Sequence, residues 1–383
     1  MRRIAFYVSI VIIVVIFNSC RKPLDIKTTT SNSNILVVEG LINIGADSTK
    51  IKLSRTVIIG NKTTANPEGN AIVTIENAQA TVATLKEITK GTYASPGLNL
   101  DKTKQYRVRI KTSTNKTYLS DLTEAKVTPP IDSVGYTINN SGMLIYANTH
   151  DATNNSRYYL YTFTEAWKFH SDYFSGYITN GTALIGRTPG QIVYYCFSSD
   201  ASTTIVLNST AALAQDIAYQ APITSIDFSS EKLQMRYSIM VTQTALTKEA
   251  YAFWDNLKKN TENLGSIFDA QPSEISGNIH NTADASEPVI GYISAATTQS
   301  KRIFIDNTGL PSKFVAKSPF TCMIDTAKIK DGGVQNNLIP IYTTLYTLAP
   351  FGLSSIEGYT YSNKSCSDCT IRGTLKQPSF WKN

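Results

Sequence analysis

The sequence is poor in the side chains that enzymes most often use for catalysis. It has only three histidines (His150, His170 and His280), and Asp, Glu, Lys and Arg make up 17% of the residues, below the roughly 25% typical of soluble proteins. It has no His-Glu-x-x-His motif, Gly-x-Ser-x-Gly turn, Gly-rich phosphate loop or EF-hand pattern. We therefore expect a protein that is not an enzyme, with no catalytic residue, metal or cofactor.

Two weak catalytic patterns have simpler explanations. His150 and Asp151 could in principle join a serine in a triad, but no nucleophile turn accompanies them. Glu165 and Glu249 could form the carboxylate pair of a glycosidase. We interpret Glu165 as a charge on a strand face and Glu249 as a charge in the first turn of a helix. A hydrolase is therefore the least favoured of the functions considered.

Long runs of basic residues are also missing. The formal net charge is +7, but lysine and arginine are scattered along the chain and form no block that would follow a phosphate backbone. We therefore expect no binding to nucleic acid. Ser, Thr, Asn and Tyr are abundant instead, which is typical of a β-rich protein outside the cytoplasm.

The first twenty residues have the pattern of a bacterial lipoprotein signal. Two arginines precede an apolar run over residues 4–17, and Ser19-Cys20 follows. An export signal has this order of charged, apolar and cleavage segments, whereas a transmembrane helix needs about 20 apolar residues. We predict a signal peptide over residues 1–19 and lipidation of Cys20, with palmitate among its acyl chains. An uncleaved anchor and cleavage that leaves Cys20 free are the alternatives.

The residues after the signal are predicted to form a tether. Residues 20–34 are polar and lack apolar periodicity, so we expect a flexible connection between the lipid and the folded part. Several acyl chains would attach Cys20 stably to a membrane, because each buried methylene adds about 0.8 kcal/mol.

Four further cysteines are present: Cys196, Cys322, Cys366 and Cys369. An even number in an exported chain predicts two disulfides, and spacing alone leaves all three connectivities open. The Cys-x-x-Cys spacing at the end of the chain also occurs in zinc sites and in redox sites. Only one such pair exists, so these two interpretations are weaker alternatives.

The pattern of strands predicts a mainly β fold with two domains. Residues 35–129 contain short segments of alternating apolar and polar residues separated by turns, as in an immunoglobulin-like or transthyretin-like β-sandwich. Pro129-Pro130 cannot continue a sheet ladder, so we place a boundary there. Residues 130–383 then form a larger β-rich domain.

Two segments of the second domain stand out. Tyr158 to Phe169 alternates aromatic with polar residues, which favours a half-buried central strand over an exposed aromatic ligand platform. The segment near residues 247–260 predicts the one firm helix, with Thr247 as its cap. Its apolar stripe indicates a helix that docks on the sheet of this domain. The stripe consists of Leu246, Ala250, Phe253, Trp254 and Leu257.

In this order, the motifs of the chain resemble those of Bacteroidetes lipoproteins grouped as domain of unknown function 4249. Besides the signal and Cys20, the motifs are Val37-Val38-Glu39-Gly40, Gln243-Thr244-Ala245-Leu246-Thr247, Ala250-Tyr251, Phe253-Trp254, Pro272-Ser273, Gly277-Asn278-Ile279, Val289-Ile290-Gly291-Tyr292, Cys366-Ser-Asp-Cys369, Gly373 and Pro378-Ser379-Phe380-Trp381.

The resemblance implies an outer-membrane lipoprotein encoded beside a TonB-dependent transporter, and it carries no catalytic or ligand residues. We therefore expect a non-catalytic binding or accessory component in nutrient uptake. A structural or adhesive envelope protein is the alternative. The resemblance favours the cell surface over the periplasmic face, although Arg21 and Lys22 stand where surface-exported lipoproteins have acidic residues. The small ligand, if there is one, stays unknown.

Overall fold

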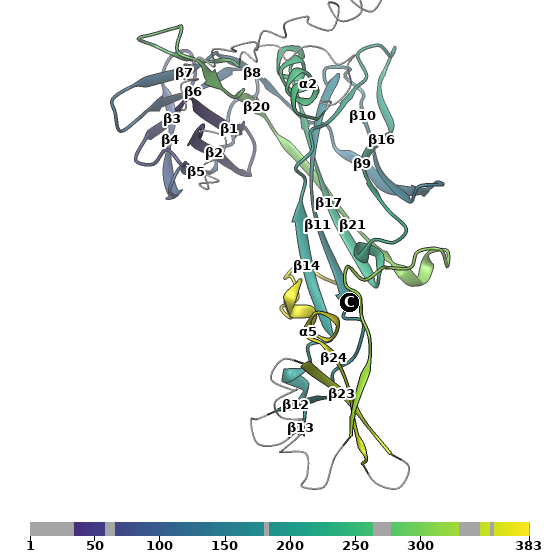
Figure 1. Cartoon of the computed structure of the whole chain (residues 1–383). Helices are drawn as coiled ribbons and strands as arrows, with labels where there is room; N and C mark the ends of the chain where they lie inside the picture. The colour runs from purple at the N-terminus through teal and green to yellow at the C-terminus, as the bar shows by residue number, and fades with distance from the viewer. Residues whose placement is uncertain are drawn as a thin grey trace, which may run out of the picture.

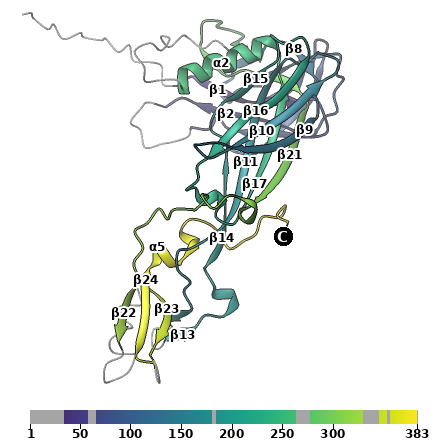
Figure 2. The same cartoon turned by 90° about the vertical axis from the view of Figure 1, so that its right-hand side faces the viewer.

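The computed structural model describes residues 34–57, 66–179, 184–262, 277–328, 345–352 and 356–382. Strands dominate this part of the chain, which confirms the mainly β prediction. Figure 1 shows a barrel at the upper left, a central region of long strands with helix α2 above it, and a narrow arm at the opposite end. The molecule is elongated, as the perpendicular view in Figure 2 also shows.

The first part is a ring of hydrogen-bonded strands in the order β6-β3-β4-β5-β2-β1-β20-β8, and β8 pairs again with β6. The sequence did not predict this closure. β7 and β18 continue the sheet beyond β6, and β19 pairs with β1. The strands are β1 (Leu36–Asn43), β2 (Ser48–Arg55), β3 (Ile72–Glu76), β4 (Thr81–Thr89), β5 (Thr92–Gly97), β6 (Gln105–Lys111), β7 (Thr117–Ser120), β8 (Thr123–Lys126), β18 (Ile279–Asn281), β19 (Val289–Ile290) and β20 (Ser294–Ala296).

Alternation along these strands fills the ring with apolar side chains. On β2, Ile51 and Leu53 are fully buried, whereas Lys50 and Lys52 are exposed on the outer side. The same alternation on the other strands gives one continuous core, in which Tyr93 is the largest fully buried side chain on β5.

Three barrel strands come from a late part of the sequence, after most strands of the second domain. β18, β19 and β20 follow helix α2 in sequence, inside the range 130–383 that the sequence analysis assigned to the C-terminal domain. The chain packs closely there: a Cβ on Gly291, which has φ +137°, would lie 2.1 Å from the Val38 carbonyl oxygen. Asn278 is buried and holds Ile293 with hydrogen bonds to its N–H and C=O at 2.8 and 2.9 Å. The Gly277-Asn278-Ile279 motif thus serves to complete the barrel.

The second part consists of two sheets that enclose a second core. One sheet has the order β16-β10-β9, and the other has the order β14-β11-β17-β21 with β15 beside β11. The strands are β9 (Ile131–Ile138), β10 (Met143–Asp151), β11 (Tyr158–His170), β14 (Tyr195–Ala201), β15 (Val206–Ser209), β16 (Asp216–Ile226), β17 (Arg236–Ala245) and β21 (Thr298–Asp306). Short 3-10 turns follow at Glu231–Leu233 and Asn307–Gly309.

Helix α2 (Lys248–Glu262) confirms the predicted helix. The Thr247 hydroxyl accepts a hydrogen bond from the Ala250 N–H at 3.2 Å, as expected of a cap. The Tyr251 ring lies 5.0 Å from that of Tyr158 on β11, so the helix docks on the outer face of the larger sheet. None of the helices in the described residues combines the length and apolar character that a membrane span requires.

The arm is the narrow end of the molecule (Figures 1 and 2). It contains a hairpin of β12 and β13 and a small sheet of order β22-β24-β23. Trp381 is buried between Phe197 and Phe304, so the C-terminal segment packs back onto the central sheet. The elements are β12 (Tyr177–Thr179), β13 (Leu184–Gly186), β22 (Asp325–Lys328), β23 (Leu345–Phe351), β24 (Gly358–Asn363), α5 (Lys364–Ser367) and 3-10 turns at Pro189–Gln191 and Cys369–Ile371.

Candidate functional site

The four predicted disulfide cysteines form two disulfides, Cys196–Cys369 and Cys322–Cys366, each with Cα atoms 5.7 Å apart. The two cysteines of the Cys-x-x-Cys motif therefore belong to different disulfides. A redox-active motif would join them to each other, and a zinc site would need them as thiolates. The Cys196–Cys369 disulfide instead attaches the C-terminal segment to β14, and the Cys322–Cys366 disulfide joins the chain just before β22 to α5 within the arm.

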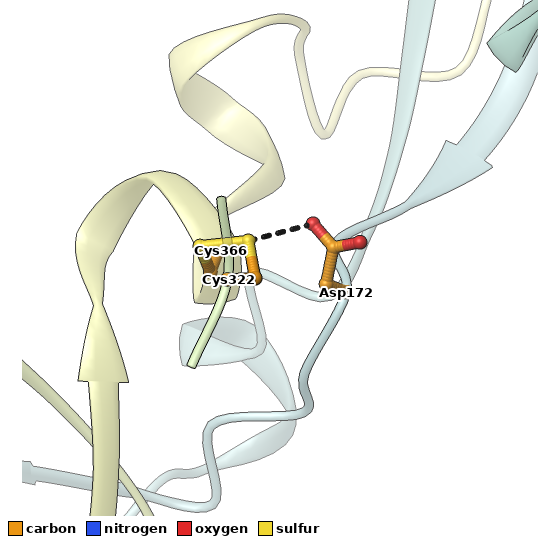
Figure 3. A group of neighbouring side chains, drawn as sticks. All are labelled: Asp172, Cys322 and Cys366. Atoms are coloured by element: carbon orange, nitrogen blue, oxygen red, sulfur yellow. Dashed lines mark hydrogen bonds between the residues drawn. A yellow bond between two sulfur atoms is a disulfide. The ribbon is translucent and has the colours of Figure 1, made fainter. Parts of the chain in front are cut away.

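Asp172 lies beside the second disulfide, and Figure 3 shows its carboxylate directed at the sulfur atoms. Asp172 Oδ2 is 3.3 Å from Cys322 Sγ, and the Ser318 hydroxyl donates to the same oxygen at 2.7 Å. The possible ligand atoms of Asp172, Cys322 and Cys366 lie within 4.8 Å of one another. A disulfide sulfur is not a thiolate, so this group is not a metal centre in the disulfide form.

Cys20, the signal over 1–19 and nearly all of the tether lie outside the described residues. Lipidation of Cys20 therefore stays a prediction.

A cleft of about 660 Å³ lies where the chain passes from the barrel to the central sheets. Two chain segments cross at this point and are fixed to each other, since Thr128 N–H donates to the Thr297 hydroxyl at 2.8 Å. They are also fixed to β17, because Gln243 Nε2 donates to the Pro129 carbonyl at 3.0 Å. These hydrogen bonds connect the cleft residues Thr128 and Pro129 to the neighbouring strands.

The polar side chains around this cleft mostly bind one another. His150 Nδ1 is 2.7 Å from Asp132 Oδ2, and Lys126 pairs with Glu124 at 3.1 Å. The Asp151 carboxylate accepts hydrogen bonds from N–H groups of its own loop. The weak triad pattern paired His150 with Asp151, but in the structure the partner of His150 is Asp132, across the β9–β10 pair.

The His150–Asp132 pair predicts a specific pH dependence. The hydrogen bond to the Asp132 carboxylate raises the pKa of His150 above 6.5, so the protonated imidazolium is favoured in the folded state. The resulting stabilisation is complete below pH 6.5 and is lost as the pH rises through the folded-state pKa. In Asp132→Asn, an NMR titration should give a lower His150 pKa. His150→Gln identifies the signal, and an unchanged pKa in Asp132→Asn would contradict the assigned partner.

The Tyr158–Phe169 segment is β11, a central strand, and its odd-numbered aromatics Tyr159, Tyr161 and Phe163 lie in the core. This confirms the central-strand interpretation. Glu165 falls in the same phase and is only 4% exposed, so the charge predicted on a strand face lies on the buried face of β11. The carboxylate is buried because Lys232 and Tyr237 both bind it.

Four aromatic rings form a surface cluster where β11 and β14 lead into the arm. The Tyr194 ring is stacked on His170 at 5.0 Å and touches Tyr195 at 4.6 Å and Phe174 at 5.5 Å. Lys168 Nζ lies 5.2 Å from the centre of the Tyr195 ring. We call His170, Phe174, Tyr194 and Tyr195 the aromatic cluster. Phe174 and Tyr195 are 50% and 47% exposed.

The backbone beneath the aromatic cluster is held from several sides. The His170 N–H donates to Gln234 Oε1 at 2.7 Å, and the Tyr194 carbonyl accepts from Ser171 N–H at 3.0 Å. The residue after Tyr195 is Cys196, which is bonded to Cys369. The backbone that carries His170, Tyr194 and Tyr195 is therefore fixed, which lowers the entropy lost when their rings bind a partner. Sequence analysis did not single out Tyr194-Tyr195. Tyr194 lies just before β14 and Tyr195 is its first residue, so strand alternation gave no signal for the pair.

A family profile matches residues 21–302, about three quarters of the chain. The chain belongs to the family described as Domain of unknown function (DUF4249). The match covers the barrel, including β18, β19 and β20, and also helix α2 and the central strands as far as the first half of β21. Much of the arm lies beyond it, including the Cys-x-x-Cys motif. No curated protein matches the chain.

Proposed function

We propose that this protein is a lipoprotein of the outer membrane that holds a TonB-dependent transporter through the aromatic cluster, as a non-catalytic component of nutrient uptake. The membrane attachment is the predicted lipid on Cys20. The cell surface is the proposed location. The transporter as partner follows from the family resemblance and the aromatic cluster is the feature of the fold that suits such a partner.

The single observation that carries the proposal is the exposed aromatic cluster, whose rings contact one another. Aromatic residues are enriched at the centres of protein interfaces because they bury a large area and lose little side-chain entropy. A small set of rings in mutual contact, with two of them half exposed, has this composition. The cluster lies at the base of the arm and is remote from the barrel, where β1 begins (Figure 1). A partner bound there would not compete with the anchor.

The test is co-purification with the TonB-dependent transporter encoded nearest to this gene, after detergent extraction of outer membranes. Replacing Phe174 and Tyr195 by serine should lower the affinity by about 30-fold or more, because loss of one interface hot spot costs at least about 2 kcal/mol. The matched control is Tyr219→Ser, which removes a tyrosine that is 75% exposed on β16. Cys20→Ala should abolish acyl labelling.

Three outcomes would count against the proposal. Equal retention of the cluster variant and the control would remove the cluster from the interface. Purification without any transporter would favour a structural or adhesive role. A Cys20→Ala chain that remains acylated would refute the anchor.

A further inference from the structure

The outer wall of the barrel carries a row of lysines beside an exposed isoleucine. Lys111 on β6 lies opposite Ile72 on β3, while Lys86 on β4 and Lys50 on β2 both lie opposite Ala94 on β5. These side chains point outward, because their neighbours along the strands are buried in the barrel core. The buried neighbours are Ile51, Val73, Leu85 and Ile110.

The three lysines have no carboxylate to neutralise them among the described residues. All three are exposed, and none forms an ion pair with another described residue. The adjacent Arg107 and Arg109 differ, since both bind Glu76. We call Lys50, Lys86, Lys111 and Ile72 the basic wall.

Apolar side chains accompany this charge. Ile72 is 58% exposed, and Val82 and Ile88 on β4 are 38% and 54% exposed. β3 and β4 lie on the side of the barrel away from β8 and β20, the strands that lead to the central sheets (Figure 1). All four side chains of the basic wall are exposed, so neither the second domain nor the arm covers them.

The length of the tether allows this wall to reach the membrane. Residues 21–33 reach at most about 45 Å when fully extended. Lys50 lies opposite Leu41, about 17 Å along β1 from Leu36. A lipid on Cys20 can therefore stay inserted while the basic wall touches the same bilayer.

We infer that the basic wall rests on the anionic headgroups of the bilayer that holds the lipid anchor. The lysine ammonium groups face the phosphates, while the lysine stems and Ile72 lie against the apolar edge of the headgroup layer. One lysine near an anionic surface strengthens binding about fivefold, so three give roughly a hundredfold. The inference rests on the proposed anchor at Cys20, and it makes the barrel the part of the molecule that contacts the bilayer.

The test uses the lipidated chain with a fluorophore on Ile72→Cys, reconstituted into vesicles of phosphatidylglycerol and phosphatidylethanolamine that contain a lipid-bound quencher. The native cysteines of the described part are all in disulfides and do not take the label. We expect quenching at position 72 that is lost in phosphatidylcholine vesicles and at about 0.5 M salt, where the Debye length falls to a few ångströms. A label on Tyr219→Cys should remain unquenched.

Two triple variants that remove the same charge distinguish an effect of the basic wall from an effect of the net charge of the protein. Lys50→Gln/Lys86→Gln/Lys111→Gln should abolish the quenching. The control, Lys317→Gln/Lys376→Gln/Lys382→Gln, removes three exposed lysines elsewhere and should preserve it.

The outcomes distinguish the wall from the anchor. A chain that incorporates into vesicles but shows no quenching at position 72 overturns the wall and leaves the anchor intact. A chain that does not incorporate refutes the anchor. Co-sedimentation of the unlipidated chain with vesicles then tests whether the basic wall binds anionic headgroups. An affinity for anionic vesicles about a hundredfold above that for neutral vesicles supports this binding, and equal affinities overturn it.

Discussion

Replacing Lys232 by methionine should destabilise the fold by about 3 kcal/mol. Glu165 is 4% exposed at the end of the core between the two central sheets. Its carboxylate is 2.5 Å from Lys232 Nζ, and it accepts a hydrogen bond of 2.5 Å from the Tyr237 hydroxyl. Methionine keeps the packing of the lysine stem but leaves a buried carboxylate without its cation. Removing one partner of a buried pair costs far more than the pair itself contributes.

Urea unfolding of the single and double variants measures this cost. Adding Glu165→Gln to Lys232→Met should recover much of the lost stability, since the amide needs no cation and its oxygen can still accept from Tyr237. Lys259→Met is the matched control. Lys259 and Asp255 form an ion pair on the surface of α2, in which both side chains are more than a third exposed. We expect the control to cost about 0.5 kcal/mol or less. Equal costs for the two lysines would mean that Glu165 is solvated.

Local patterns predicted the elements of this fold well. Helix α2 has a cap, a stripe of apolar residues and a length that together distinguish a helix from a strand. β11 was recognisable from alternation, and the even number of cysteines predicted two disulfides. Each of these signals lies within a short window of sequence or in a simple count, so it does not depend on how the chain folds back on itself.

The closure of the barrel could not be predicted in this way. β19 and β20 have two and three residues, too few to show a period, and they pair with β1 from more than 200 positions away. Non-local pairings of this kind leave no mark on local propensity. The proline pair at 129–130 does lie between the barrel and the central sheets, but the second crossing of the chain, at Thr297, carries no comparable breaker.

The same limit applies to the candidate sites. His150 binds Asp132 because β9 and β10 are antiparallel neighbours, whereas the sequence offers only the adjacent Asp151. The aromatic cluster joins residues from the end of β11, the loop after it and the start of β14. Glu165 did leave a trace in the sequence, because it occupies the buried phase of an otherwise aromatic alternation. A charge in that phase indicates a buried partner.

Removing the Cys196–Cys369 disulfide should cost about 4 kcal/mol, the second large effect that the fold predicts. The bond joins residues 173 positions apart, so its loss releases a long loop in the unfolded chain. It also frees the C-terminal segment, in which Thr374 pairs with Phe197 and Trp381 packs on the central sheet. Because Cys196 follows Tyr195 directly, the aromatic cluster should lose its rigidity as well.

Urea unfolding of the double variant Cys196→Ala/Cys369→Ala, monitored by tryptophan fluorescence, measures this loss of stability. Cys322→Ala/Cys366→Ala is the internal comparison, because its cysteines are 44 positions apart and the chain-entropy difference is about 1 kcal/mol in favour of the longer loop. The first variant should also lose affinity for the transporter, since its cluster must be ordered on binding. The reverse order of stabilities would show that the shorter disulfide, beside Asp172, holds the arm more strongly than loop length predicts.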